Sequence, residues 1–243
     1  MRLLRVNTLE PVEFMPNAIP PYAILSHTWD IDEVSYQELV STDKSWQSKA
    51  GWAKIRGCAR KAAADGHGYI WVDTCCIDKK SSAELQEAIN SMFQWYSRAQ
   101  VCYAYLSDVS IASPFETSSF RQARWWSRGW TLQELLAPEQ MVFFDRDWYE
   151  IGRKDQLLEE VEQISNIGRI ILGHPGIIHC ASIAERMSWM AGRSTTREED
   201  LAYCLLGIFD IHMPMLYGEG HNAFSRLQQE IMKASDDMTL LAW

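Results

Sequence analysis

The chain has 243 residues, of which 47% are hydrophobic and 23% are charged, so it can bury a full core. Its formal net charge of −9 argues against a broad surface for nucleic acid or for anionic membranes. No segment has the low-complexity composition of a disordered region. These properties indicate a folded protein with one large domain, or one domain and a helical appendage.

Six cysteines occur, and none belongs to a C-x-x-C pair. Most lie in apolar surroundings, which is typical of buried free thiols. The first residues lack the apolar core and cleavage site of a secretion signal, and no apolar run reaches membrane-spanning length. We therefore expect a reducing, cytoplasmic location and no membrane contact.

In the first part of the chain, short apolar runs alternate with segments of helical periodicity. The expected strands cover residues 22–27, 69–77, 101–106 and 141–144, and a small hairpin is expected at residues 3–6 and 12–14. The expected helices cover residues 52–64, 82–98 and 127–136. This alternation predicts an α/β fold, a mainly parallel sheet flanked by helices.

After about Gly152 the apolar runs of strand length stop. The expected helices here cover residues 156–171, 182–190, 196–209 and 220–234, and Thr196 with Glu199 fits a capping box. We expect residues 1–152 to form the α/β core and residues 153–243 to form a helical layer packed on it. No polar linker separates the two parts, so one compact unit is expected.

The first candidate site is the segment directly after the first buried strand. Ser26, His27, Thr28 and Trp29 place a hydroxyl, an imidazole and an indole at the carboxyl end of that strand. In open α/β sheets, ligands bind outside the carboxyl ends of the strands. The alternative is a turn with a capping serine and a packed tryptophan.

The second candidate site is acidic. Asp73 and Asp78 follow the strand predicted from residue 69, and Glu84 and Glu87 lie in the first turns of the next helix. Residues three apart share roughly one helix face, and Glu84 is the nearer of the two to the strand ends. These groups could hold an anion-binding or sugar-binding site, or they could simply cap and solvate the helix.

The third candidate site combines arginine with tryptophan in residues 124–134. Arg124 and Arg128 offer bidentate contacts to phosphate, and Trp130 offers a stacking face. Gln133 and Glu134 could hold hydroxyl groups. The alternative is a helix whose tryptophans anchor it in the core.

Other chemistry is disfavoured. The glycines of residues 216–221 suggest a structural turn, because the Lys-Ser/Thr ending of a phosphate loop is absent. The sequence contains no G-x-S-x-G, H-E-x-x-H or G-x-G-x-x-G motif. A zinc site at His27, Cys75 and Cys76 is disfavoured, because adjacent residues of a strand point to opposite faces. We expect no metal.

Four ordered motifs resemble the fungal heterokaryon incompatibility (HET) domain. The resemblance continues through residues 196–209 and 213–220. The motifs are residues 22–29 (Tyr-Ala-Ile-Leu-Ser-His-Thr-Trp), 71–78 (Trp-Val-Asp-Thr-Cys-Cys-Ile-Asp), 83–96 and 127–134 (Ser-Arg-Gly-Trp-Thr-Leu-Gln-Glu). The resemblance implies a role in programmed cell death on non-self recognition, as one module of a longer receptor.

HET domains are in turn similar, more distantly, to TIR domains, which have a flavodoxin-like sheet. Many TIR domains cleave NAD+ with a glutamate carried on a helix, and they signal through self-association. The segment Ser81-Ser-Ala-Glu84-Leu85 is similar to the start of the helix that carries this glutamate in plant TIR domains. This likeness implies a catalytic role for Glu84 and NAD+ as the substrate, with no bound cofactor.

The resulting hypothesis places NAD+ over the carboxyl ends of the first strands. Glu84 accepts hydrogen bonds from the ribose hydroxyls and stabilises positive charge as the glycosidic bond breaks, while His27 and Asp73 shape the ribose pocket. Further binding contacts are expected from aromatic, basic and polar side chains: Trp29 or Trp130 stacking on a ring, Arg124 or Arg128 on the pyrophosphate, and Ser26, Asp78 and Glu87 nearby.

Two other function classes fit the same sequence. The chain could be a non-catalytic adaptor that oligomerises and recruits partners, or a sensor that binds a nucleotide without cleaving it. Self-association and an upstream receptor or fused sensor domain are the expected protein partners.

Overall fold

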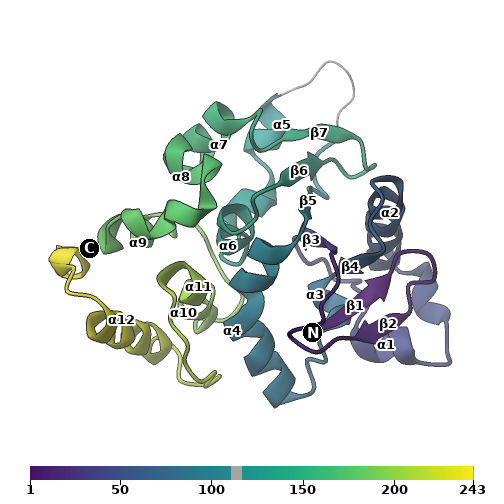
Figure 1. Cartoon of the computed structure of the whole chain (residues 1–243), viewed down its shortest axis with the longest axis horizontal. Helices are drawn as coiled ribbons and strands as arrows, with labels where there is room; N and C mark the ends of the chain where they lie inside the picture. The colour runs from purple at the N-terminus through teal and green to yellow at the C-terminus, as the bar shows by residue number, and fades with distance from the viewer. Residues whose placement is uncertain (111–116, 243) are drawn as a thin grey trace.

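The fold is built around one seven-stranded sheet with the strand order β2-β1-β4-β3-β5-β6-β7 (Figure 1). The structure is a computed structural model that describes residues 1–110 and 117–242. The strands are β1 (Arg2–Arg5), β2 (Pro11–Glu13), β3 (Ala23–His27), β4 (Tyr69–Trp71), β5 (Val101–Tyr105), β6 (Met141–Phe144) and β7 (Glu150–Arg153).

The middle of the sheet is parallel. Strands β4, β3, β5 and β6 pair in parallel, while β1, β2 and β7 are antiparallel additions at the edges. Counted in chain order, the parallel strands lie in the order 2-1-3-4, as at the start of a flavodoxin-like sheet. The α/β prediction and the edge hairpin are therefore confirmed.

Helices cover both faces of the sheet. In Figure 1, α2 lies on one side, α4 and α6 lie on the other, and α9 to α12 lie beyond them. The α-helices are α1 (Tyr36–Val40), α2 (Ala50–Ala64), α3 (Asp73–Cys76), α4 (Ser82–Arg98), α5 (Thr117–Arg121), α6 (Thr131–Leu136), α7 (Leu158–Ser165), α8 (Arg169–Gly173), α9 (Ile183–Ser188), α10 (Asp200–Tyr203), α11 (Leu206–Phe209) and α12 (Asn222–Ala234). The 3-10 helices are η1 (Ser45–Ser48), η2 (Arg124–Ser127), η3 (Pro175–Cys180) and η4 (Met238–Ala242).

Strand β3 is buried along its whole length, and this explains its almost continuous apolar sequence. It pairs with β4 on one side and β5 on the other, with Ala23 opposite both Ile70 and Val101. Its last residues, Ser26 and His27, are polar and still buried. Buried polar groups require partners, and the partners of these two residues form the site described below.

The strand expected at residues 69–77 is wrong beyond Trp71. The chain instead turns into α3, where the amide of Cys76 donates to the carbonyl of Val72 at 2.8 Å. An apolar run alone cannot separate a strand from a buried helical turn. The argument against zinc that treated Cys75 and Cys76 as strand neighbours therefore loses its premise.

Several short elements are not predicted from the sequence, and strand β7 and helix α1 are two of them. Strand β7 is half polar and lies across the predicted boundary at residue 152, where it pairs with β6 through a bulge. Helix α1 has only five residues, although Ser35 and Glu38 form a complete capping box at its start. Neither element is long enough to show a clear period in the sequence.

The second half of the chain is helical, as expected, but its helices are shorter. Asn166, with a φ of 56°, ends α7 and separates it from α8. The capping box expected at Thr196 does not form, because α10 starts at Asp200 and Thr196 instead accepts a hydrogen bond from Arg128. Glu199 binds backbone amides of a later turn.

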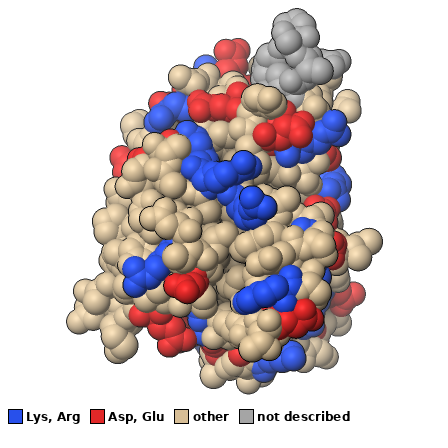
Figure 2. Space-filling model, turned by 90° about the vertical axis from the view of Figure 1, so that its right-hand side faces the viewer, with Lys and Arg blue, Asp and Glu red and all other residues tan. Residues whose placement is uncertain are grey.

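The molecular face around α1 and α2 carries both kinds of charge, and basic side chains gather in one group across its upper middle (Figure 2). On α2, Arg56 and Arg60 are exposed. A locally basic surface thus exists on a chain of net charge −9. Among residues 1–110 and 117–242, no helix has both the length and the apolar composition needed to cross a membrane.

The packing of α11 on α4 depends on a glycine, and this gives a stability prediction. A Cβ atom on Gly207 would lie 2.0 Å from the Cβ of Phe93, so Gly207→Ala must push the two helices apart. We expect a loss of about 1–3 kcal/mol in the free energy of unfolding, measured in urea. Gly176→Ala is the control, since nothing lies within 4 Å of its added Cβ. Equal stability of the two variants would contradict this close packing.

Candidate functional site

A cavity of about 310 Å³ lies at the carboxyl ends of β3 and β4. Its walls come from residues that follow these strands, from α4 and α6, and from the helical second half of the chain. Leu85, Ile89 and Met92 give it an apolar side on α4. Both predicted parts of the chain therefore contribute to one cavity.

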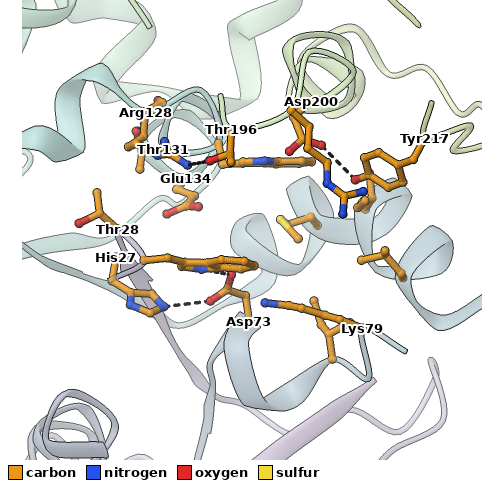
Figure 3. Close-up of a pocket in the computed structure, with 17 residues that line it drawn as sticks. His27, Thr28, Asp73, Lys79, Arg128, Thr131, Glu134, Thr196, Asp200 and Tyr217 are labelled. Atoms are coloured by element: carbon orange, nitrogen blue, oxygen red, sulfur yellow. Dashed lines mark hydrogen bonds and ion pairs between the residues drawn. The ribbon is translucent and has the colours of Figure 1, made fainter. Parts of the chain in front are cut away.

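One wall of the cavity is organised around Asp73 (Figure 3). Oδ1 of Asp73 lies 2.9 Å from Nε2 of His27, and Oδ2 accepts a hydrogen bond of 2.7 Å from the Trp29 indole. Burial by itself would raise the pKa of Asp73, but the charge of Lys79 and the bonds from His27 and Trp29 hold it at about 2. Asp73 is therefore an ionised carboxylate at neutral pH.

Glu134 is the second carboxyl group of the cavity, and Figure 3 shows it pointing into the space. It comes from α6, and the hydroxyl of Ser26 donates to its Oε2 while accepting a 2.8 Å bond from the Trp125 indole. Burial raises the pKa of Glu134 to about 8, opposed by the Ser26 bond and assisted by the charge of Asp73. Glu134 is thus mainly a neutral acid at pH 7, beside an ionised Asp73.

The opposite wall is organised around Asp200 (Figure 3). The Tyr217 hydroxyl donates to Asp200 at 3.0 Å, and the Trp130 side chain is also hydrogen-bonded to this carboxyl group. Burial raises the pKa of Asp200, and these two bonds oppose the rise. Because Trp29 is fixed to Asp73 and Trp130 to Asp200, the two indoles are attached to opposite walls.

Three cations line the cavity: Lys79, Arg128 and Arg197. The Lys79 ammonium lies 3.3 Å from the centroid of the Trp29 ring, and the Arg197 guanidinium lies 4.4 Å from that of Tyr217. Arg128 donates to Thr196 at 3.2 Å. The cavity therefore combines aromatic faces, carboxyl groups of opposite protonation state, and cations suited to phosphate.

The structure brings together seven of the residues named in the three candidate segments. They line the cavity: His27, Thr28, Trp29, Asp73, Arg128, Trp130 and Glu134. Ser26 lies behind the wall and acts on the cavity through Glu134.

Glu84 is not part of the cavity lining. Its two oxygens accept hydrogen bonds from Arg2 at 2.8 and 3.3 Å, and Oε1 also accepts from the amide of Asp78 at 2.7 Å. These contacts attach the edge hairpin to the start of α4. The catalytic role of Glu84 stays a prediction that the geometry of this cavity does not favour.

Three other predicted residues also lie outside the cavity lining. Asp78 accepts bonds from Gln37 and from the Lys80 amide, and Glu87 is exposed on α4. Arg124 forms an ion pair of 3.0 Å with Asp30.

Sequence reasoning missed several residues of the cavity. Thr131 lines the cavity three residues before Glu134 on α6, although only Glu134 is named from the sequence, as a partner for hydroxyl groups. Lys79 directly follows the motif of residues 71–78, and a cationic side chain beside that motif could have indicated a place in the site. Asp200, Arg197 and Tyr217 carry no local signal, because they reach the cavity only through tertiary packing.

Residues 216–221 form a turn that is stabilised by hydrogen bonds to Glu199, a residue outside the turn. The amides of Gly218 and Gly220 donate to Glu199 at 2.6 and 3.1 Å, and both glycines have positive φ. This turn carries Tyr217 into the cavity wall. Within the described residues, no group of three or more His, Cys, Asp or Glu side chains is arranged to hold a metal ion.

Comparisons with known proteins agree on the family. Residues 22–122 match the family described as "Heterokaryon incompatibility protein (HET)". The chain is also 47% identical, over 247 aligned residues, to "Vegetative incompatibility protein HET-E-1" of Podospora anserina. That alignment covers 96% of this chain but only 18% of the relative. No solved structure matches the chain. The chain belongs to the HET domain family.

The unusual pKa of Glu134 predicts how stability changes with pH. An unfolded glutamate ionises near pH 4.5, whereas folded Glu134 ionises near pH 8, so the free energy of unfolding falls as pH rises through this window. The decline is at most about 1.4 kcal/mol per pH unit. Glu134→Gln has no carboxyl group to ionise and should not show this decline. Measured by urea unfolding, the difference in the free energy of unfolding between Glu134→Gln and the wild type should shift by about 2 kcal/mol in favour of the variant from pH 5.5 to pH 7.5.

Glu139→Gln, which removes an exposed carboxylate, is the matched control and should follow the wild type. Parallel pH curves for the wild type and Glu134→Gln would show that Glu134 is ionised in the folded protein at neutral pH.

Proposed function

We propose that this HET domain is a cell-death effector module of fungal non-self recognition, and that its cavity binds NAD+ and cleaves the bond to nicotinamide. The observation that carries the proposal is the composition of the cavity. It combines two indoles on opposite walls, the carboxyl groups of Asp73 and Glu134, and the three cations.

A dinucleotide has three features that match these groups. A planar base stacks on an indole, which Trp29 and Trp130 both provide. The pyrophosphate carries negative charge, for which Arg128 and Arg197 are suited. The ribose hydroxyls require hydrogen-bonding partners within the cavity, and Glu134 points into it.

The chemistry needs a carboxylate beside the ribose. Cleavage breaks the bond between ribose C1′ and the nicotinamide nitrogen, both electrons pass to that nitrogen, and neutral nicotinamide leaves. The remaining ribosyl oxocarbenium ion is attacked by water, which releases one proton and yields ADP-ribose. The positive nicotinamide ring favours the ionised form of Glu134, whose negative charge then stabilises the oxocarbenium ion.

Glu134 thereby takes the role that the resemblance to TIR domains implied for Glu84. Glu134 points into the cavity, while both oxygens of Glu84 are already bound by Arg2. Asp73 contributes a fixed negative charge on the neighbouring wall.

The biological part of the proposal comes from the family. The relative from Podospora anserina is named a vegetative incompatibility protein, and this chain spans about a fifth of its length. We propose that the domain acts as one module of a larger receptor in the cytoplasm, where self-association brings several copies of the domain together. A non-catalytic adaptor and a nucleotide sensor are the competing outcomes of the experiments below.

The first experiment measures nicotinamide release. The purified chain is incubated with NAD+ at high protein concentration under crowding, and the products are separated by chromatography. We expect nicotinamide and ADP-ribose, with a loss of about 100-fold or more in rate for Glu134→Gln. Glu84→Gln is the matched control and should retain activity, because Glu84 lies outside the cavity lining. Activity that survives Glu134→Gln and is lost in Glu84→Gln would reverse the assignment.

The second experiment measures binding with a fluorescent NAD+ analogue. Stacking on an aromatic side chain contributes about 1–3 kcal/mol per base, so Trp130→Ala should weaken binding roughly tenfold. Trp95, which is attached to α4 away from the cavity lining, provides the control variant Trp95→Ala. Saturable binding without cleavage would establish the sensor, and the absence of both would establish the adaptor.

A further inference from the structure

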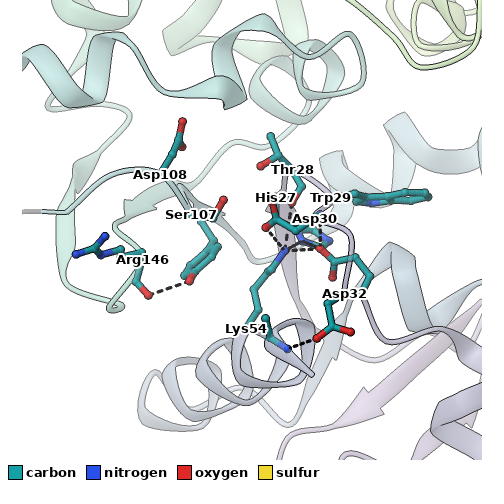
Figure 4. A network of polar contacts seen from close by, with 12 residues as sticks. His27, Thr28, Trp29, Asp30, Asp32, Lys54, Ser107, Asp108 and Arg146 are labelled. Carbon is teal, nitrogen blue, oxygen red and sulfur yellow. Dashed lines mark hydrogen bonds and ion pairs between the residues drawn. The ribbon is translucent and has the colours of Figure 1, made fainter. Parts of the chain in front are cut away.

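A buried lysine lies directly behind the Asp73 wall. Lys54 of α2 is only 5% exposed, and its Nζ is 2.9 Å from Nδ1 of His27 and 3.2 Å from the carbonyl of Thr28 (Figure 4). Its third close contact is Oε1 of Glu33 at 2.5 Å. Lys54 therefore lies between His27 and an acidic group that does not line the cavity.

The direction of these hydrogen bonds follows from the chemistry of the groups. An ammonium has three donors and no acceptor, so Nδ1 of His27 must accept the bond from Lys54. A neutral imidazole then carries its proton on Nε2, which lies 2.9 Å from Oδ1 of Asp73. The chain of donors runs from Lys54 through His27 to Asp73.

We infer that Lys54 is a positioning residue, which holds His27 as a neutral imidazole with its proton on Nε2 and thereby fixes the Asp73 carboxylate at the cavity wall. With Trp29 donating to the other oxygen, each oxygen of Asp73 accepts one hydrogen bond. Both bonds set the plane of the carboxylate. His27 orients Asp73 in this arrangement and does not transfer protons.

The surrounding charges support the ammonium form of Lys54. Glu33 pairs with it directly, and Asp30 lies 3.6 Å from its Nζ. The Tyr105 ring also faces it, with its centroid 5.9 Å from Nζ. Glu33 Oε1 is 3.8 Å from Nδ1 of His27, so it would attract a proton to that nitrogen if Lys54 were absent.

Two more titratable groups of the cavity, Lys79 and Glu134, interact with Asp73. The Lys79 ammonium lowers the pKa of Asp73, and the charge of Asp73 raises the pKa of Glu134. The bonds from Lys54 to His27 and from His27 to Asp73 involve neither group, so the donor direction between Lys54 and His27 is unchanged.

The test is ¹⁵N NMR of the histidine ring nitrogens in the full chain, with His27 assigned by its loss in His27→Gln. In the wild type at pH 7, we expect a protonated Nε2 and an unprotonated Nδ1. In Lys54→Met, Nδ1 loses its donor, so we expect a measurable fraction of the rings to carry a proton on Nδ1. Lys61→Met is the matched control, because Lys61 is on the same helix and pairs with Asp65 outside this network. Its His27 signals should match those of the wild type.

The wild-type spectrum alone can overturn the inference, even if Lys54→Met does not fold. A proton on Nδ1 at pH 7, in either the other tautomer or the doubly protonated ring, contradicts it. Lys54→Arg retains a cation and should retain the Nε2 tautomer, and failure to do so contradicts it as well.

An activity readout rests on the proposed function. If nicotinamide is released, Lys54→Met should lower kcat by about 10- to 100-fold with a smaller change in KM. An unchanged kcat would contradict positioning through His27. If the wild type releases no nicotinamide, the proposed function fails while the NMR result still decides the tautomer.

Discussion

The carboxyl end of β3 is the constraint on which the site depends. Successive residues of a strand point to opposite faces, so Ser26 and His27 are directed to different sides of the sheet. Ser26 donates to Glu134 on α6, while His27 contacts Asp73 on α3 and Lys54 on α2. One short buried strand end therefore contacts two of the carboxyl groups that line the cavity, Asp73 and Glu134.

The polar atoms of Ser26 and His27 have hydrogen-bonding partners although both residues are buried. Ser26 and His27 are fully or almost fully buried, and a buried polar group without a partner costs about 1–3 kcal/mol. A substitution that removes one of these side chains therefore also leaves its hydrogen-bonding partner without that bond. Burial raises the pKa of both Glu134 and Asp73, but the charge of Lys79 and the bonds from His27 and Trp29 keep the pKa of Asp73 low, so the two protonation states differ. Two carboxyl groups with different protonation states in one cavity are typical of acid–base and charge-stabilising sites.

Sequence reasoning was most successful where local pattern and structure coincide. The buried strand at residues 22–27, the helix at residues 82–98 and the strand at residues 141–144 follow directly from hydrophobic periodicity. The polar residues at the strand ends were found for the same reason, because a strand end is recognisable and its ligand-binding role is general.

The choice of the central glutamate shows what local pattern cannot provide. Glu84 and Glu134 each lie in the first turn of a helix. They differ because Arg2, far away in the sequence, binds both oxygens of Glu84, while Glu134 is bound by Ser26 and lines the cavity. Contacts across such separations depend on the tertiary fold. The contribution of Asp200 and Tyr217 was hidden for the same reason.

The distribution of cavity residues also defines the smallest part of the chain that can form the complete cavity. The family match ends at residue 122, before Arg128, Trp130 and Glu134. The similarity to the relative from Podospora anserina covers 96% of the chain. Asp200 and Tyr217 come from the helical second half, and they hold one wall of the same cavity. The helical half therefore does more than cover the sheet, because it supplies Asp200, which holds the Trp130 indole, and Tyr217 to the wall opposite Asp73.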